Sequence, residues 1–148
     1  MTARGRATSD RLAGTLSTVI QALRRILASD PRIAYALVFG STARGDASEH
    51  SDCDVAVGLA KGVRLSSLEI GRLVAHLEEA AGRSVDLVLL DEAPPGLAYR
   101  IFRDGRPIEV RDGDAMTERK VRAILEYLDF QPIEALCARG VLDKRHGR

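Results

Sequence analysis

The hydrophobic positions of the chain alternate between helical and strand-like periods. Between residues 10 and 28 apolar side chains recur every three or four positions, which predicts a helix that begins after Ser9 and ends before Pro31. The stretch from Ile33 to Phe39 is continuously apolar, which is typical of a strand buried on both faces. The polar, small-residue segment that follows is expected to be irregular, apart from one helical turn over 42–45.

The same analysis predicts further strands and helices in the middle of the chain. Residues 52–59 and 84–90 are predicted to be two further strands. Between them Ser66 and Glu69 match a capping box, the pattern in which two side chains satisfy the first backbone groups of a helix. Gly82 is a natural end for that helix, because glycine readily adopts the left-handed backbone found there.

Beyond residue 95 the predicted elements are shorter. They are a short helix over 96–103, an edge strand over 106–110, a helix ended by Pro132 and a second short helix up to Ala138. The succession of helices and strands indicates an α/β or α+β fold, with a small mixed β-sheet covered by helices. We expect a single domain over 10–140, between a disordered N-terminus (1–9) and a flexible tail (141–148).

Composition and charge are those of a single globular domain. The 148 residues are 45% hydrophobic, and a chain of this length buries a core without disulfides or metals. Its net charge of +1 argues against an extensive nucleic-acid-binding surface. Two cysteines, Cys53 and Cys137, cannot form a disulfide framework, and neither a signal sequence nor a membrane-length apolar segment is recognisable. These features predict a cytoplasmic protein.

Two carboxylates stand at the start of the second predicted strand. Residues two apart in a strand share a face, so Asp52 and Asp54 are expected to point the same way, about 7 Å apart along the backbone. Cys53, between them, is expected to face the core. Carboxylates this close repel each other unless a cation lies between them, and Mg²⁺ accepts one or two carboxylates together with substrate phosphate oxygens. The pair therefore predicts a magnesium site, and the competing interpretation is a solvated strand end.

Asp86 is a third acidic candidate, because it interrupts the apolar strand predicted over 84–90. An unpaired carboxylate buried in such a strand is costly, and a salt bridge to an arginine would satisfy it. Alternatively, this strand lies beside the strand that carries Asp52 and Asp54. In that case three carboxylates converge, and they can hold two Mg²⁺ ions for phosphoryl or nucleotidyl transfer.

The segment between the first two strands has the features of a phosphate-binding loop. Gly40 has no side chain, so a phosphate can approach its backbone closely, and Ser41 adds a hydroxyl. Arg44 can reach the same phosphates, or it can pair with an acidic residue of its own loop, Asp46 or Glu49. The segment is not a Walker A loop, because the lysine and the hydroxyl residue required after the second glycine are missing.

These residues together resemble a known signature. Gly40-Ser41, followed after ten intervening residues by Asp52-x-Asp54, resembles the motif of the DNA polymerase beta-like nucleotidyltransferases. The longer run, Gly-Ser-x-Ala-Arg-Gly and then Ser-Asp-x-Asp-Val-Ala-Val, is similar to the minimal nucleotidyltransferase (MNT) branch. The resemblance covers residues 33–90 and implies the polymerase beta-like nucleotidyltransferase fold.

The resemblance also implies roles for the motif residues. Three aspartates, Asp52, Asp54 and Asp86, would bind Mg²⁺, while Gly40 and Ser41 would hold the nucleoside triphosphate. Members of the MNT branch are often antitoxins that accompany a HEPN-domain toxin. The chain is therefore expected to transfer AMP from ATP to a tyrosine of a HEPN toxin, with no membrane or nucleic acid as partner.

Two other functions stay open at this stage. One is a non-catalytic interaction module that neutralises its partner by covering it, and the other is a small-molecule nucleotidyltransferase that works as a dimer. The three carboxylates favour an enzyme, because a binding module does not need them. The small size of the chain leaves little room for an acceptor-binding domain, which favours a folded protein as the acceptor.

Overall fold

The computed structural model describes residues 3–48 and 50–146, with side chains for residues 15–48 and 50–131. The order of elements is α1 (Ala3–Ser29), β1 (Ile33–Phe39), α2 (Gly40–Arg44), β2 (Cys53–Leu59), α3 (Ser67–Ala81), β3 (Val85–Leu89), α4 (Pro95–Asp104), β4 (Arg106–Val110) and α5 (Gly113–His146). The strands form one mixed sheet in the order β3-β2-β1-β4. Strand β1 is antiparallel to β2 and β4, whereas β2 and β3 are parallel and connected through α3.

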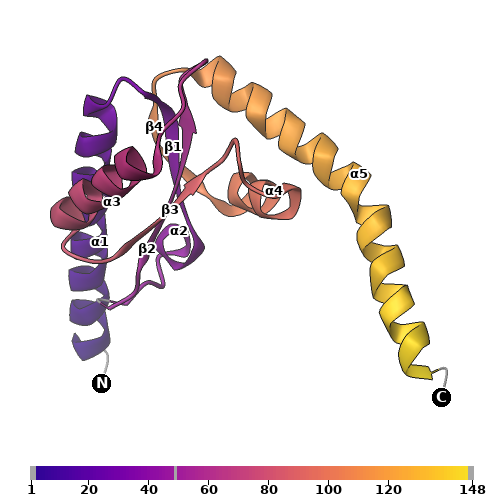
Figure 1. Cartoon of the computed structure of the whole chain (residues 1–148). Coiled ribbons are helices and arrows are strands. Elements are labelled where there is room, and N and C mark those ends of the chain that lie inside the picture. The colour runs from indigo at the N-terminus through magenta and orange to yellow at the C-terminus, as the bar shows by residue number, and fades with distance from the viewer. Residues whose placement is uncertain (1–2, 49, 147–148) are drawn as a thin grey trace.

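Helices cover both faces of the sheet (Figure 1). Helices α1 and α3 pack on one face, against side chains that include Val38, Val55 and Val57. Helices α4 and α5 pack on the other face, against Tyr35 and Leu37 among others. The first six residues of β1 are buried, because this strand lies inside the sheet and between both helical layers. The predicted mixed sheet covered by helices is confirmed.

Helix α3 begins and ends as the sequence predicts. The Ser66 hydroxyl accepts a hydrogen bond from the Glu69 backbone N–H at 3.2 Å, and the Glu69 carboxylate accepts one from the Ser66 N–H at 2.7 Å. Gly82 closes the helix with φ 67°, in the left-handed region. This helix sets the parallel arrangement of β2 and β3, because a parallel pair needs a crossover connection.

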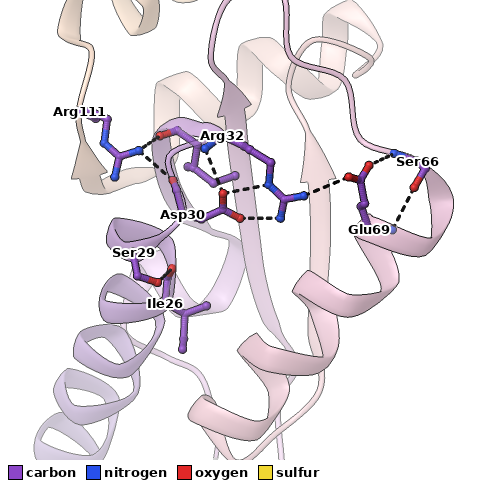
Figure 2. Close-up of polar contacts among 8 residues, drawn as sticks. Ile26, Ser29, Asp30, Arg32, Ser66, Glu69 and Arg111 are labelled. Atoms are coloured by element: carbon purple, nitrogen blue, oxygen red, sulfur yellow. Dashed lines mark hydrogen bonds and ion pairs between the residues drawn. The ribbon is translucent and has the colours of Figure 1, made fainter.

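Charged side chains fix the connection between α1 and β1 (Figure 2). The Arg32 guanidinium binds the Asp30 carboxylate at 2.8 Å and reaches Glu69 at the start of α3 at 3.4 Å. The Arg111 guanidinium donates hydrogen bonds to the carbonyls of Ala28 and Asp30, at 2.6 and 2.8 Å. Ala28 lies in the last turn of α1, where the carbonyls have no partner within the helix, so Arg111 satisfies one of these carbonyls.

Two helices are longer than the hydrophobic pattern predicts. Helix α1 begins at Ala3 and so includes residues 3–9, a segment rich in Ala and Arg, which favour helices. Helix α5 runs through Pro132 to His146, so the predicted end at Pro132 and the separate short helix are wrong. A proline inside a helix removes one hydrogen bond and bends the helix without having to end it. Figure 1 shows α5 bending midway and extending away from the sheet.

Two contacts illustrate how the first half of α5 is fixed to the rest of the fold. Arg119 is only 5% exposed, and its guanidinium donates two hydrogen bonds to the Leu90 carbonyl, at 3.1 and 2.7 Å. The Tyr127 ring stacks on Tyr99 of α4 with 4.0 Å between ring centroids. Cys53 is a buried free thiol, and the side chain of Cys137 lies outside the described residues. Across the described residues, no helix combines the length and the hydropathy needed to cross a membrane.

Candidate functional site

The connection from β1 to α2 turns on Gly40. This residue has φ 62°, in the left-handed region that residues with a side chain rarely adopt. A side chain here would also overlap the carboxylate of Asp54, because an added Cβ would lie too close to its Oδ2 atom. Ser41 follows and is half-buried, and α2 ends at Gly45 with φ 76°. The backbone of Gly40 therefore lies directly against a carboxylate of β2.

The strands place two of the predicted aspartates side by side. Asp54 of β2 is the register partner of Asp86 on the parallel strand β3. Residues in register on neighbouring strands project on the same face, so both carboxylates point to the same side of the sheet. Asp54 is also paired with Phe39, the last residue of β1. The two carboxylates therefore stand at the end of the sheet where β1 leads into Gly40.

Asp52 lies one residue before β2 begins, although the sequence predicts a strand from that position. The first backbone hydrogen bond that joins this end of β2 to the chain before β3 is donated by Cys53, to the Ser84 carbonyl at 2.9 Å. Asp52 is exposed and belongs to the loop between α2 and β2. Its carboxylate is therefore positioned by that loop and not by the strand.

The environment of Asp86 differs from the expected buried strand. Strand β3 lies at an edge of the sheet, and Asp86 is exposed to solvent. Among the residues whose side chains are described, no arginine forms an ion pair with it. Solvent thus removes the cost of an unpaired buried charge, and the alternative role of Asp86 as an arginine partner finds no support.

The aspartates influence one another electrostatically. Burial raises the pKa of Asp54, and the negative charges of Asp86 and Asp52 raise it further, while the Arg44 cation lowers it. In the absence of a cation, ionised Asp54 is therefore less favourable than an isolated carboxylate. A divalent cation near these carboxylates would remove that repulsion.

The donor set fits Mg²⁺ only together with a substrate. Within the described part of the chain, no three acidic, histidine or cysteine side chains form a ready-made metal site. Mg²⁺ does not require one, because it is commonly held by one or two carboxylates, several waters and substrate phosphates. Asp54 with Asp86 or Asp52 can supply that number of carboxylates, and the backbone of Gly40 lies directly against Asp54.

Arg44 adopts the alternative that the sequence left open. Its Nε atom lies 3.3 Å from the Asp46 carboxylate, and both side chains are more than half exposed. An exposed ion pair of this kind is weak, because water and salt screen it. The same cation lowers the pKa of Asp54, so it is also within electrostatic range of the β2 carboxylates.

Cys53 stands on the opposite side of β2 from the carboxylates. It belongs to the core cluster beneath α1 and α3, as the alternation along the strand predicts. Burial raises the pKa of its thiol, which therefore stays protonated and apolar in character. Cys53 therefore packs in the core behind β2.

One residue beside the site has no counterpart in the sequence analysis. The Arg83 guanidinium donates a hydrogen bond to the Ser48 carbonyl in the loop before Asp52, at 3.3 Å. The two residues are 35 positions apart. No local pattern marks such a contact, because only the crossover through α3 returns the chain to this loop.

Comparison with known proteins identifies the family of the chain. The sequence model of the family described as polymerase beta nucleotidyltransferase matches residues 21–114, a segment that includes Gly40, Asp54 and Asp86. The chain belongs to this family and is a nucleotidyltransferase.

The chain is also similar to individual proteins of known name or structure. A putative protein adenylyltransferase of Methanocaldococcus jannaschii is 38% identical over 69 residues, which cover 47% of this chain and 72% of that protein. A crystal structure of a toxin-antitoxin with AMP-PNP has a TM-score of 0.69 at 24% identity, covering 86% of this chain and 98% of the other. The complex of a tri-AMPylated HEPN toxin with MNT antitoxin from Shewanella oneidensis has a TM-score of 0.65 at 21% identity, covering 88% and 98%. At these identities the two structures establish the fold.

Proposed function

We propose that this protein is a Mg²⁺-dependent protein adenylyltransferase that transfers AMP from ATP to a tyrosine of a HEPN-domain toxin, and thereby acts as the antitoxin. The observation that carries the proposal is the pairing of Asp54 with Asp86, with the Asp54 carboxylate directly against the backbone of Gly40. Charged oxygens gathered at a glycine turn suit phosphoryl chemistry better than they suit a dry binding surface.

Each motif residue has a role in this reaction. Asp52, Asp54 and Asp86 would hold the metal, in a site that takes up to two ions, and bound Mg²⁺ would neutralise the triphosphate and the departing pyrophosphate. Gly40 and Ser41 would bind the triphosphate through backbone N–H groups and the hydroxyl. Arg44 would exchange Asp46 for a phosphate, since its present ion pair is exposed and weak.

The transfer step makes one bond and breaks one bond. The acceptor oxygen attacks the α-phosphorus of ATP, and the bond from that phosphorus to the bridging oxygen of pyrophosphate breaks. The proton of the acceptor hydroxyl must leave as the bond forms. The exposed Asp86 carboxylate is the group that we assign to receive this proton or to lower the pKa of the hydroxyl.

The acceptor is proposed from the relatives. The M. jannaschii protein is named for protein adenylylation, and the S. oneidensis complex contains a toxin that carries AMP. Tyrosine is proposed because its phenol loses its proton more readily than the alcohol of serine or threonine. A stoichiometric binding module would need none of the three carboxylates, so their variants separate the two functions.

The test is mass spectrometry of the partner, purified from cells that express this chain or its Asp86→Ala variant. We expect the partner to be heavier by one or more AMP groups with the parent chain. With Asp86→Ala it should be unmodified and toxic, although still bound. An unmodified partner that both proteins neutralise equally well would contradict the proposal and establish the binding module.

A further inference from the structure

The three carboxylates are not restrained to the same degree. Asp54 and Asp86 lie inside β2 and β3, whose hydrogen-bonded register fixes their backbones. Asp52 precedes β2 and is exposed. Among the residues with described side chains, none forms an ion pair with the Asp52 carboxylate. The position of Asp52 therefore depends on how firmly the loop that carries it is held.

That loop contains a small closed turn directly before Asp52. The backbone N–H of Ser51 donates to the Ser48 carbonyl at 3.1 Å, and the Ser48 N–H donates to the Ser51 hydroxyl at 2.9 Å. The two hydroxyl groups also lie 2.9 Å apart. These bonds lock the turn internally, but they do not attach it to the rest of the fold.

The attachment comes from the segment between α3 and β3. Arg83 donates from Nη1 to the Ser48 carbonyl at 3.3 Å, so that carbonyl accepts from both Ser51 and Arg83. The next residue, Ser84, accepts a hydrogen bond from the N–H of Cys53 at 2.9 Å. Asp52 thus lies between two points at which residues 83–84 hold the chain. Of these two contacts, only that of Arg83 uses a side chain.

We propose that Arg83 is a positioning residue, which holds the Ser48–Ser51 turn and so places the Asp52 carboxylate for metal binding. The inference deepens the proposed function and rests on it. Arginine suits this task, because its planar guanidinium is always charged and loses less freedom for each hydrogen bond than the flexible chain of lysine. The energetic scale is that of outer-shell partners, whose loss typically weakens metal binding about 10- to 100-fold.

The test measures the loop and the metal separately from turnover. Hydrogen exchange of the Ser51 amide in the metal-free protein reports on the turn. Electron paramagnetic resonance of Mn²⁺, with a non-hydrolysable ATP analogue present, reports on the metal. We expect Arg83→Gln to speed the exchange and to weaken Mn²⁺ binding by about tenfold. Arg83→Lys should restore part of both, since its ammonium can also donate to the Ser48 carbonyl.

Arg72→Gln is the matched control. Arg72 lies on α3, the helix that precedes Arg83, and is exposed, but it lines the hollow next to Asp30 and Arg32 at the opposite end of the sheet. Its loss removes the same charge without touching the loop, so both signals should stay at the parent values. Equal effects of the two substitutions would overturn the proposal, because the cause would then be the change in net charge.

A double variant tests the path through the turn. If Arg83 acts by holding the turn, Arg83→Gln combined with Ser51→Ala should weaken Mn²⁺ binding no more than the stronger single change. Additive losses would contradict this path. Unchanged exchange with lost affinity for the nucleotide alone would also contradict it, because Arg83 would then bind the triphosphate itself.

The failure of this inference can be told apart from failure of the proposed function. The double variant Asp52→Asn/Asp54→Asn should lose Mn²⁺ and AMP transfer together if the proposed function is right. If it does so while Arg83→Gln keeps parent values, only the role of Arg83 is wrong. If it keeps both Mn²⁺ binding and AMP transfer, the assignment of the metal site is wrong, and so is the positioning role of Arg83.

Discussion

The Cβ position of Gly40 and the Oδ2 atom of Asp54 occupy the same space, so residue 40 can adjoin this carboxylate only as glycine. The positive φ of 62° imposes a second restriction at the same residue. Two independent demands, one from the backbone and one from the neighbouring strand, thus select glycine where β1 reaches the candidate site.

Gly40→Ala should therefore damage the site beyond its effect on folding. The left-handed backbone alone costs an L-residue about 1–2 kcal/mol of stability. The added methyl group must also displace the Asp54 carboxylate. We expect binding of a non-hydrolysable ATP analogue with Mg²⁺ to weaken at least about tenfold, which equals about 1.4 kcal/mol. Calorimetric titration measures this loss, and the larger Gly40→Val should lose more.

Gly45→Ala separates the two effects. Gly45 has φ 76°, so alanine meets the same backbone strain there, but nothing lies within 4 Å of its added Cβ. The stability of the Gly45→Ala protein should fall by a similar amount, about 1–2 kcal/mol, which is the cost of the backbone conformation. Nucleotide affinity should stay near the parent value. Equal losses of affinity in both variants would mean that strain in α2, and not the Asp54 contact, controls the site.

Asp54→Asn should stabilise the metal-free protein while it strongly slows transfer. Because the pKa of Asp54 is raised in the fold, the native state binds more protons than the unfolded chain just above pH 3.8. The contribution of the Asp54 carboxyl to the stability of the parent protein is therefore greatest at low pH, and it falls as the pH rises through the native pKa. Asparagine does not ionise, so the variant does not lose this stability as the pH rises and should be the more stable protein at pH 7.

Urea unfolding of the metal-free protein at several pH values tests this sign. The transfer rate should drop by about 100-fold or more, as is usual for a group that acts on the reacting phosphate. Glu79→Gln is the control, because Glu79 is an exposed carboxylate on α3 and its loss should change neither property. A less stable Asp54→Asn protein at pH 7 would show that this carboxylate is held by a favourable partner.

Much of the fold can be predicted from local pattern, because local rules act on it. The seven apolar residues of β1 and the capping box at Ser66 each specify their element without reference to distant residues. The continuation of α5 through Pro132 is not predictable in this way, because proline lowers helix stability without dictating where a helix ends. Tertiary contacts such as the one between Arg119 and the Leu90 carbonyl fix the first half of this helix, before Pro132.

The candidate site shows the same division. The spacing of Gly40 and Asp54 can be recognised in the sequence, and strand alternation puts Cys53 on the opposite side. The exposure of Asp86 cannot be recognised in the sequence, because it depends on β3 being an edge strand. The contact between Arg83 and Ser48 is equally invisible, since it joins residues 35 positions apart.

A final prediction concerns the opposite end of the sheet, where Asp30 binds Arg32 (Figure 2). The Asp30 carboxylate accepts hydrogen bonds from the Arg32 backbone N–H and Nε, both at 3.0 Å, and from Nη2 at 2.8 Å. These bonds lower the pKa of Asp30. Asp30→Asn keeps one acceptor oxygen and loses the charge, so we expect it to cost about 1–2 kcal/mol of stability at pH 7.

The pH dependence gives this prediction its sign. A lowered native pKa means that the unfolded chain binds more protons, so the contribution of Asp30 is present above pH 3.8 and is lost as the pH falls through the native pKa. The difference between parent and Asp30→Asn, measured by urea unfolding, should therefore narrow toward acid. Asp104→Asn is the control, because the Arg103–Asp104 pair has the same 2.8 Å separation with both side chains more than half exposed. Water screens that pair, so its loss should matter much less, and equal losses at the two positions would show that burial adds nothing at Asp30.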